Sequence, residues 1–173
     1  MKKLLFMLFI VTASGGLCAQ KSFAQAPVLL SGINDESDYY KFAALVRSAG
    51  IEADLKTAGT YTSLAPHNVL FRNMAPEKLD SLQNDKAKLA MVLKAHIIKG
   101  KFTKADIIKK LSLGKGKATL TNLLGQPLKL SLGADKALVV TDIKGNKANF
   151  LKFDITDPQG VIHGIDNVLM IGK

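Results

Sequence analysis

Apolar residues recur at helical spacing in the first half of the chain. The segment 35–50 begins with acidic residues, ends at a glycine and carries one apolar face, which consists of Phe42, Leu45, Val46 and Ala49. Pro76 suits the first turn of a second helix, and Asp85 can cap a third that runs to Lys94. Thr103 to Asp106 has the form of a capping box and introduces a fourth. The pattern therefore predicts a mainly helical first half, with a further helical turn in 67–74.

After Gly114 the apolar pattern changes to a period of two. Two runs alternate with polar residues and each predicts a strand with one buried face: Leu128, Leu130 and Leu132 in the first, Leu151, Phe153 and Ile155 in the second. Shorter strands are expected at Tyr61 to Ala65, which Pro66 ends, and at 161–165 and 168–171. Helices followed by strands predict an α+β domain with a largely antiparallel sheet system.

The first residues have the pattern of a secretory signal. Lys2 and Lys3 precede an apolar run from Leu4 to Val11, which is too short to span a bilayer, and small residues follow. Cleavage after Ala24 fits best, and cleavage after Ala19 is the alternative. The expected organisation is a signal peptide at 1–24, an N-terminal extension at 25–32 and one domain at 33–173.

Export places the expected protein in the periplasm, on the cell surface or outside the cell. Cys18 could be the lipid-attachment site of a lipoprotein. We treat this as the lesser alternative, because lipoprotein processing prefers a small residue directly before the cysteine and Leu17 stands there. As the single cysteine of the chain, Cys18 excludes an internal disulfide and leaves no cysteine cluster for zinc or iron–sulfur chemistry.

The composition is typical of a folded domain with a net positive charge. The 173 residues are 47% hydrophobic and 22% charged, which is too apolar for a disordered chain. The net charge of +10 favours association with anionic surfaces.

Three stretches together resemble the fasciclin-like domain family. YTSLAPHNVLF at 61–71 resembles the first conserved box of that family, and GVIHGIDNVL at 160–169 resembles the second more closely. Between them, LKAHIIKGKF at 93–102 resembles the central Tyr-His segment, with Ala95 in place of the tyrosine. The resemblance runs from Ile33 to Ile171. It implies a wedge of two β-sheets with an N-terminal helical layer, a role in adhesion, and no shared catalytic site.

The resemblance also implies roles for individual residues. Asp154 and Ile155 match an Asp-Ile pair that is implicated in receptor binding in animal members. Strand alternation offers a plainer interpretation, which we favour: Ile155 belongs to the core and Asp154 is its solvated neighbour. His67 stands where a threonine or serine cap is usual.

No residue pattern points to catalysis or to a metal. His96 and His163 lie in apolar surroundings, so we expect buried imidazoles that hydrogen-bond backbone groups. Pro66 and Gly160 are expected to have structural roles as well. Catalytic motifs are absent apart from Ser112-x-x-Lys115, whose companion motifs are missing. We therefore predict no enzyme activity, no cofactor and no metal site.

Lysines concentrate in one stretch. Residues 86–117 contain ten lysines and a single acidic residue, Asp106. The candidate contacts for an anionic partner are Lys99, Lys101, Lys104, Lys109, Lys110, Lys115 and Lys117. We expect no nucleic-acid partner, because the stretch has no arginine, Phe102 is its one stacking group and an export signal precedes it. A solvated face that keeps the domain soluble is the competing interpretation.

These observations leave three hypotheses. The first is a secreted or cell-surface adhesion module that binds a surface protein or an anionic polysaccharide, without a membrane span or catalysis. The second is a small-molecule carrier or enzyme with a site between the helical layer and the sheets. The third is a structural subunit of a surface assembly. The sequence does not fix the oligomeric state.

Overall fold

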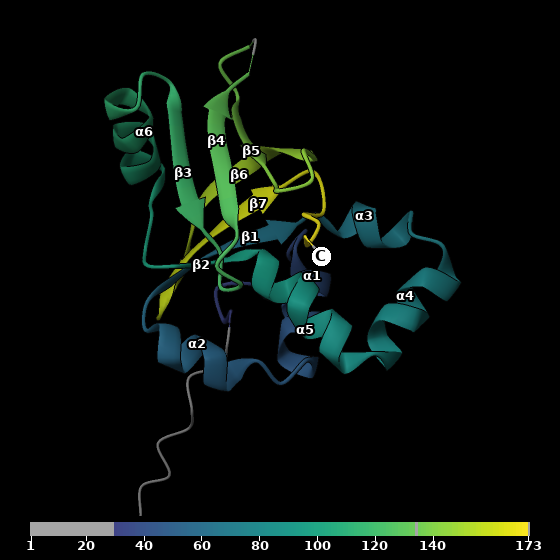
Figure 1. Ribbon diagram of the computed structural model, residues 1–173. Coiled ribbons are helices and arrows are strands. Elements are labelled where there is room, and N and C mark those ends of the chain that lie inside the picture. Colours follow the sequence, from purple (N-terminus) through teal and green to yellow (C-terminus); the bar gives the residue numbers. More distant parts are fainter. Residues whose placement is uncertain (1–29, 134, 173) are drawn as a thin grey trace, which may run out of the picture.

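The computed structural model describes residues 30–133 and 135–172 (Figure 1). Within these residues, helices dominate the first part of the chain and strands the second, which confirms the α+β class. The helices are α1 (Tyr40–Ser48), α2 (Glu52–Ala58), α3 (Asn68–Arg72), α4 (Pro76–Asn84), α5 (Lys86–Ala95) and α6 (Lys104–Leu113). The strands are β1 (Tyr61–Pro66), β2 (Ile97–Lys99), β3 (Lys117–Thr121), β4 (Pro127–Leu132), β5 (Leu138–Thr141), β6 (Lys147–Asp157) and β7 (Gly160–Ile165).

The strands form one hydrogen-bonded series in the order β2-β1-β7-β6-β5-β4-β3. Neighbours are antiparallel except β1 and β7, which run parallel. A bridge between Ile98 in β2 and Asn122, directly after β3, links the two ends of the series, so the mixed sheet is nearly closed. The expected wedge of two separate sheets is therefore not confirmed in that form.

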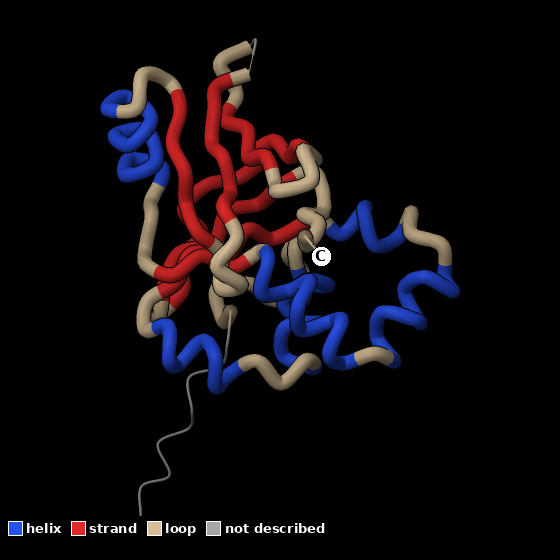
Figure 2. The backbone as a smooth tube through the Cα atoms, viewed as in Figure 1, coloured by secondary structure: helices blue, strands red, loops and turns tan. Residues whose placement is uncertain are grey.

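Two apolar clusters make up the core. The first lies between β1 and the helices and includes Phe42, Val46, Leu55 and Leu93. The second lies inside the curved sheet and under α6, and Leu128 and Leu130 belong to it. Figure 2 shows the corresponding division of the helices, with α6 set apart from α1 to α5. Because each of its faces meets a different cluster, β1 is buried along its whole length.

Local capping explains the helix starts. The side chain of Asp85 accepts a hydrogen bond from Lys88 N, and Pro76 is the first residue of α4. Thr103 and Asp106 form the predicted capping box of α6. His67, in place of the usual hydroxyl residue, caps α3 because its Nδ1 accepts from Val69 N. Helix α2 was not predicted, since its seven residues are too few to show a period.

The predicted orientation of two strands is wrong in part. Leu151 is 53% exposed, whereas Ala148 and Phe150 are buried. The reason is a pair of register shifts in β6, between Phe150 and Ile155, which move the inward face from even to odd positions. Leu132 is 51% exposed because it lies at the end of β4, beyond the covered part of the sheet.

The predicted strand at 168–171 does not form. Its backbone donors go to side chains rather than to a neighbouring strand: Leu169 N donates to His96 Nε2 at 2.9 Å and Met170 N to Asp142 Oδ2 at 2.7 Å. Leu169 is fully buried in the second cluster. Of this apolar segment only Leu169 is buried, and Met170 is 42% exposed, so the pattern predicted neither the burial of the whole segment nor its backbone conformation.

The expected signal peptide, Cys18 and most of the expected extension lie outside the described residues. Leu30, at the end of that extension, is buried in the first cluster. In the part of the chain that the structure describes, no helix has the length and apolar character needed to cross a membrane.

Candidate functional site

The Asp-Ile pair lies in the irregular part of β6. Asp154 has a φ of 56°, a left-handed conformation that the neighbouring register shift requires. Its carboxylate accepts a hydrogen bond from Lys104 N at 2.9 Å, so it also fixes the start of α6. The Asp154 side chain is 43% exposed. Ile155 is half-buried and packs against the first core cluster.

His163 joins this bulge to the loop before α6. Its Nε2 donates to the Phe102 carbonyl at 2.8 Å, and its Nδ1 accepts from Asp154 N at 3.1 Å. The ring is fully buried, and the rings of Phe150 and Phe153 lie 5.7 Å away. Burial lowers the pKa of His163. The imidazole is therefore a neutral link between β7, β6 and the α6 loop.

His96 makes a similar link elsewhere. Its Nδ1 donates to Val92 O at 2.8 Å and its Nε2 accepts from Leu169 N, which ties α5 to the C-terminal segment. Burial lowers the pKa of His96 to about 4. Among the described residues, no group of three or more His, Cys, Asp or Glu side chains is arranged to hold a metal ion.

Pro66 and Gly160 lie at opposite ends of the parallel pair β1 and β7. Gly160 pairs with Tyr61, and a Cβ atom at Gly160 would lie 2.0 Å from the Tyr61 carbonyl oxygen. Pro66 pairs with Ile165, where the next donor, His67 N, bonds to Ile165 O at 3.0 Å. The close approach of the two backbones thus requires glycine at position 160. Proline fits at position 66, because no backbone N–H donor is needed there.

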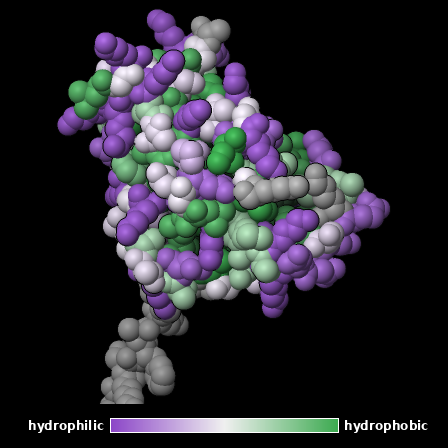
Figure 3. All heavy atoms as spheres, viewed as in Figure 1, coloured by the Kyte–Doolittle hydropathy of each residue, from purple (hydrophilic) through white to green (hydrophobic). Residues whose placement is uncertain are grey.

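The ten-lysine stretch divides in space. Lys94, on α5, forms an ion pair with Asp54 at 2.8 Å, and Lys86 and Lys88 lie at the other end of that helix. The remaining lysines are exposed on or beside α6: Lys99, Lys101, Lys104, Lys109, Lys110, Lys115 and Lys117. We call these seven residues the α6 surface. Hydrophilic residues dominate the part of the molecule around α6, at the upper left of Figure 3.

Two of its lysines are held by aromatic rings. The ammonium group of Lys104 lies 4.7 Å from the centroid of the Phe153 ring, and that of Lys110 lies 5.2 Å from the Phe102 ring. Two carboxylates reduce the positive charge nearby, Asp106 in the capping box and Asp154 at the helix start. The α6 surface is therefore basic but not uniformly so.

Two grooves flank Phe102. The larger, of about 520 Å³, includes Lys99, Lys110 and polar side chains of the β3 edge, namely Thr119, Thr121 and Asn122. The smaller, of about 280 Å³, includes Lys101, Lys109, Lys110 and the exposed Leu113. Lys104, Lys115 and Lys117 line neither groove. The sequence did not predict that these threonines line a groove or that Phe102 lies between two grooves. The alternating polar residues of β3 were the one signal that could have indicated the threonines.

Fold and site together describe an α+β binding domain built on a nearly closed mixed sheet, with a basic surface beside it. The Fasciclin domain family model matches residues 37–171, and the chain belongs to this family. The resemblance found in the sequence is therefore confirmed.

Relatives agree with this assignment. The chain is 26% identical over 140 residues to the Synechocystis protein sll1735, a match that covers 81% of this chain and 94% of the relative. It is 28% identical over 138 residues to transforming growth factor-beta-induced protein ig-h3 of Sus scrofa, covering 80% of this chain and 18% of that protein.

A solved structure has the same fold. The FAS1 domain pair from the insect cell adhesion molecule fasciclin I matches with a TM-score of 0.62 and 22% identity, over 79% of this chain and 46% of that one.

Proposed function

We propose that this chain is an exported adhesion module that binds its partner through the α6 surface and catalyses no reaction. Membership of the fasciclin family supports the general role, since a cell adhesion molecule carries this fold. The observation that carries the proposal is the convergence of lysines from β2, the following loop and α6 around Phe102 and its two grooves.

The chemistry of the larger groove favours an anionic polysaccharide as the partner. An aromatic ring can lie against the apolar face of a sugar, while the exposed hydroxyl side chains of Thr119 and Thr121 suit its hydroxyl groups. Ammonium groups of Lys99 and Lys110 at the same groove suit carboxylate or sulfate substituents. An acidic protein would use the charges but not the groove.

Asp154 and Ile155 remain proposed contacts at the margin of this surface. Asp154 is partly exposed and lies at the N-terminus of α6, since its carboxylate accepts a hydrogen bond from Lys104 N. Ile155 packs inward, so its contribution would come through the backbone bulge.

A site between the helical layer and the sheet finds less support. The cavity there that includes His96 has a volume of about 20 Å³, room for about one water molecule. Both ring nitrogens of His96 are also engaged with backbone groups. No feature of this cavity favours a carrier or an enzyme.

A charge-matched pair of variants tests the proposal. The surface variant changes Lys99, Lys101, Lys109 and Lys110 to glutamine. The control variant also carries four changes to glutamine, and therefore has the same net charge as the surface variant. Its changes are at exposed lysines outside the α6 surface: Lys56, Lys86, Lys88 and Lys144. Binding of the full chain to immobilised alginate, an anionic polysaccharide, is measured against neutral dextran at several salt concentrations.

We expect the surface variant to lose about tenfold or more in alginate affinity, while the control stays within about twofold of the unmodified chain. Binding should weaken with added salt, and dextran should not bind. Equal losses in both variants would show that net charge alone matters and would refute the assignment to the α6 surface. Binding to an acidic protein but not to alginate would refute the polysaccharide.

A further inference from the structure

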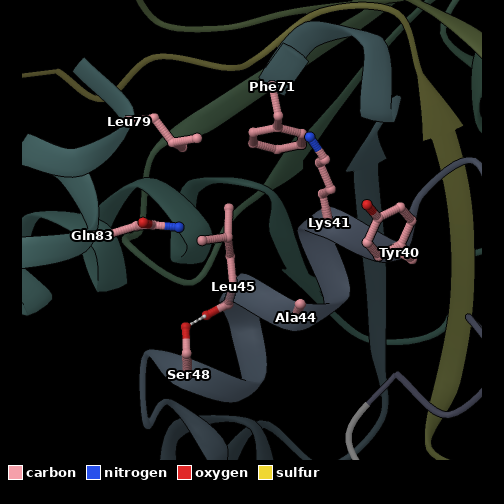
Figure 4. Close-up of a pocket in the computed structure, with 8 residues that line it drawn as sticks. All are labelled: Tyr40, Lys41, Ala44, Leu45, Ser48, Phe71, Leu79 and Gln83. Atoms are coloured by element: carbon pink, nitrogen blue, oxygen red, sulfur yellow. Dashed lines mark hydrogen bonds between the residues drawn. The ribbon is translucent and has the colours of Figure 1, made fainter. Parts of the chain in front are cut away.

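A third groove lies among helices α1, α3 and α4, which are different elements from those of the α6 surface. Its volume is about 420 Å³, which is within the range of small-molecule sites. Figure 4 shows the residues that line it: Tyr40, Lys41, Ala44, Leu45, Ser48, Phe71, Leu79 and Gln83.

The floor of this groove is apolar. Leu45 and Phe71 belong to the first core cluster, and Leu79 packs against that cluster from α4. In Figure 4 the Leu45 side chain extends from α1 toward Leu79 and Gln83, and the Phe71 ring closes another side. A ligand with an apolar chain or ring would therefore replace water over aliphatic and aromatic carbon.

Lys41 supplies the charge of the groove. All the lining residues are described by the structure, and none of them is an aspartate or glutamate. No ion pair of Lys41 with a described carboxylate occurs. The Lys41 side chain is half-buried and points toward the Phe71 side of the groove in Figure 4. An ammonium group in such a partly apolar setting favours an anionic partner.

The backbone holds Lys41 in place. Lys41 N donates to Asn68 Oδ1 at 3.0 Å, and Asn68 Nδ2 donates to Ser37 O at 2.9 Å, so the start of α1 is fixed against α3. The hydroxyl of Ser48 is already used, because it donates to Leu45 O at 2.9 Å. Tyr40 and Gln83 provide the remaining polar groups of the rim.

We propose that this groove binds a small amphiphilic monocarboxylate, whose carboxylate pairs with Lys41 and whose apolar part covers Leu45, Phe71 and Leu79. This proposal rests on the match of such a ligand to one cationic group above an apolar floor without acidic residues. It is independent of the polysaccharide proposal, because the two sites share no residue.

Octanoate and 1-octanol form a matched pair of probes, since they share the chain length and differ in the charged group. Calorimetry on the full chain compares the unmodified protein with Lys41→Gln and with Lys56→Gln, a control at an exposed lysine of α2. Amide chemical shifts of Ala44 and Gln83 report whether binding occurs in the groove.

The unmodified chain and the control should bind octanoate about fivefold more tightly than 1-octanol, and Lys41→Gln should remove this preference. Leu79→Ala should weaken both probes while leaving the preference in place. The inference is overturned if neither probe shifts the groove amides, or if Lys41→Gln keeps the preference for octanoate. Circular dichroism of each variant checks that the fold is retained.

Discussion

Acidification should destabilise the domain through His96. The folded state holds this ring neutral, because burial lowers its pKa from the ordinary 6.5 to about 4. One nitrogen accepts from Leu169 N, so protonating it would also place two N–H groups face to face. Between these two pKa values the unfolded chain binds a proton that the folded chain does not. The contribution of neutral His96 to the free energy of unfolding is therefore fully present above pH 6.5 and falls as the pH is lowered toward 4.

The size of the effect follows from the same values. A difference of one pKa unit corresponds to about 1.4 kcal/mol, so the lowered pKa of His96 predicts a loss of about 3 kcal/mol across this window. Burial also lowers the pKa of His163, which adds to the loss in the same direction. The pKa values of Asp106 and Asp142 are held below 3.8, so the stability that these carboxylates provide is lost at still lower pH.

Urea denaturation at intervals from pH 7.5 to pH 4 measures this dependence. His96→Gln removes the titrating ring but keeps an amide that can donate to Val92 O. The variant should be less stable than the unmodified chain at pH 7.5 and should lose about 3 kcal/mol less on acidification. A flat stability profile for the unmodified chain, or equal slopes for both proteins, would refute the assignment of the transition to His96.

Three further substitutions test the framework, each by chemical denaturation at pH 7.5. Gly160→Ala places a Cβ atom 2.0 Å from a backbone oxygen and should destabilise by about 3 kcal/mol or prevent folding; stability within about 0.5 kcal/mol of the unmodified chain would contradict the close approach. Tyr61→Phe removes the 2.8 Å hydrogen bond to Asp157 and should destabilise by about 1–2 kcal/mol, whereas no change would show that water replaces it. Thr103→Ala opens the capping box with Asp106 and should cost about 1 kcal/mol, and a loss as large as that of Gly160→Ala would point to a tertiary role.

Features that depend on neighbours in sequence were predictable. The starts of α4, α5 and α6 follow from Pro76, Asp85 and the Thr103 capping box, whose partners lie within three residues. The β7 strand was equally predictable, since 161–165 is mainly apolar, and it packs between β1 and β6, buried along its whole length. In these cases the local pattern and the tertiary structure agree.

Features set by distant partners were not predictable. The inward face of β6 changes at a bulge whose position depends on how Lys152 and Ile155 pair with β7. The segment around Leu169 is buried without being a strand, because His96 and Asp142 accept its backbone donors. Likewise, ten lysines close in sequence divide between α5 and the α6 surface, a separation that only the chain path through β2 produces.

The α6 surface is coupled to the core through Phe102, and this coupling affects how binding experiments are interpreted. Phe102 N donates to Thr62 Oγ1 at 2.8 Å, and its carbonyl accepts from His163 at 2.8 Å, so the ring beneath Lys110 is anchored to β1 and β7. A ring fixed in this way limits the freedom of the lysine above it, which reduces the entropy lost on binding. If the proposed function holds, a change at His163 should therefore weaken partner binding without altering the α6 surface itself. Loss of binding in a His163 variant that circular dichroism shows to be folded identifies a positioning effect, whereas loss in a lysine variant of unchanged stability identifies a contact.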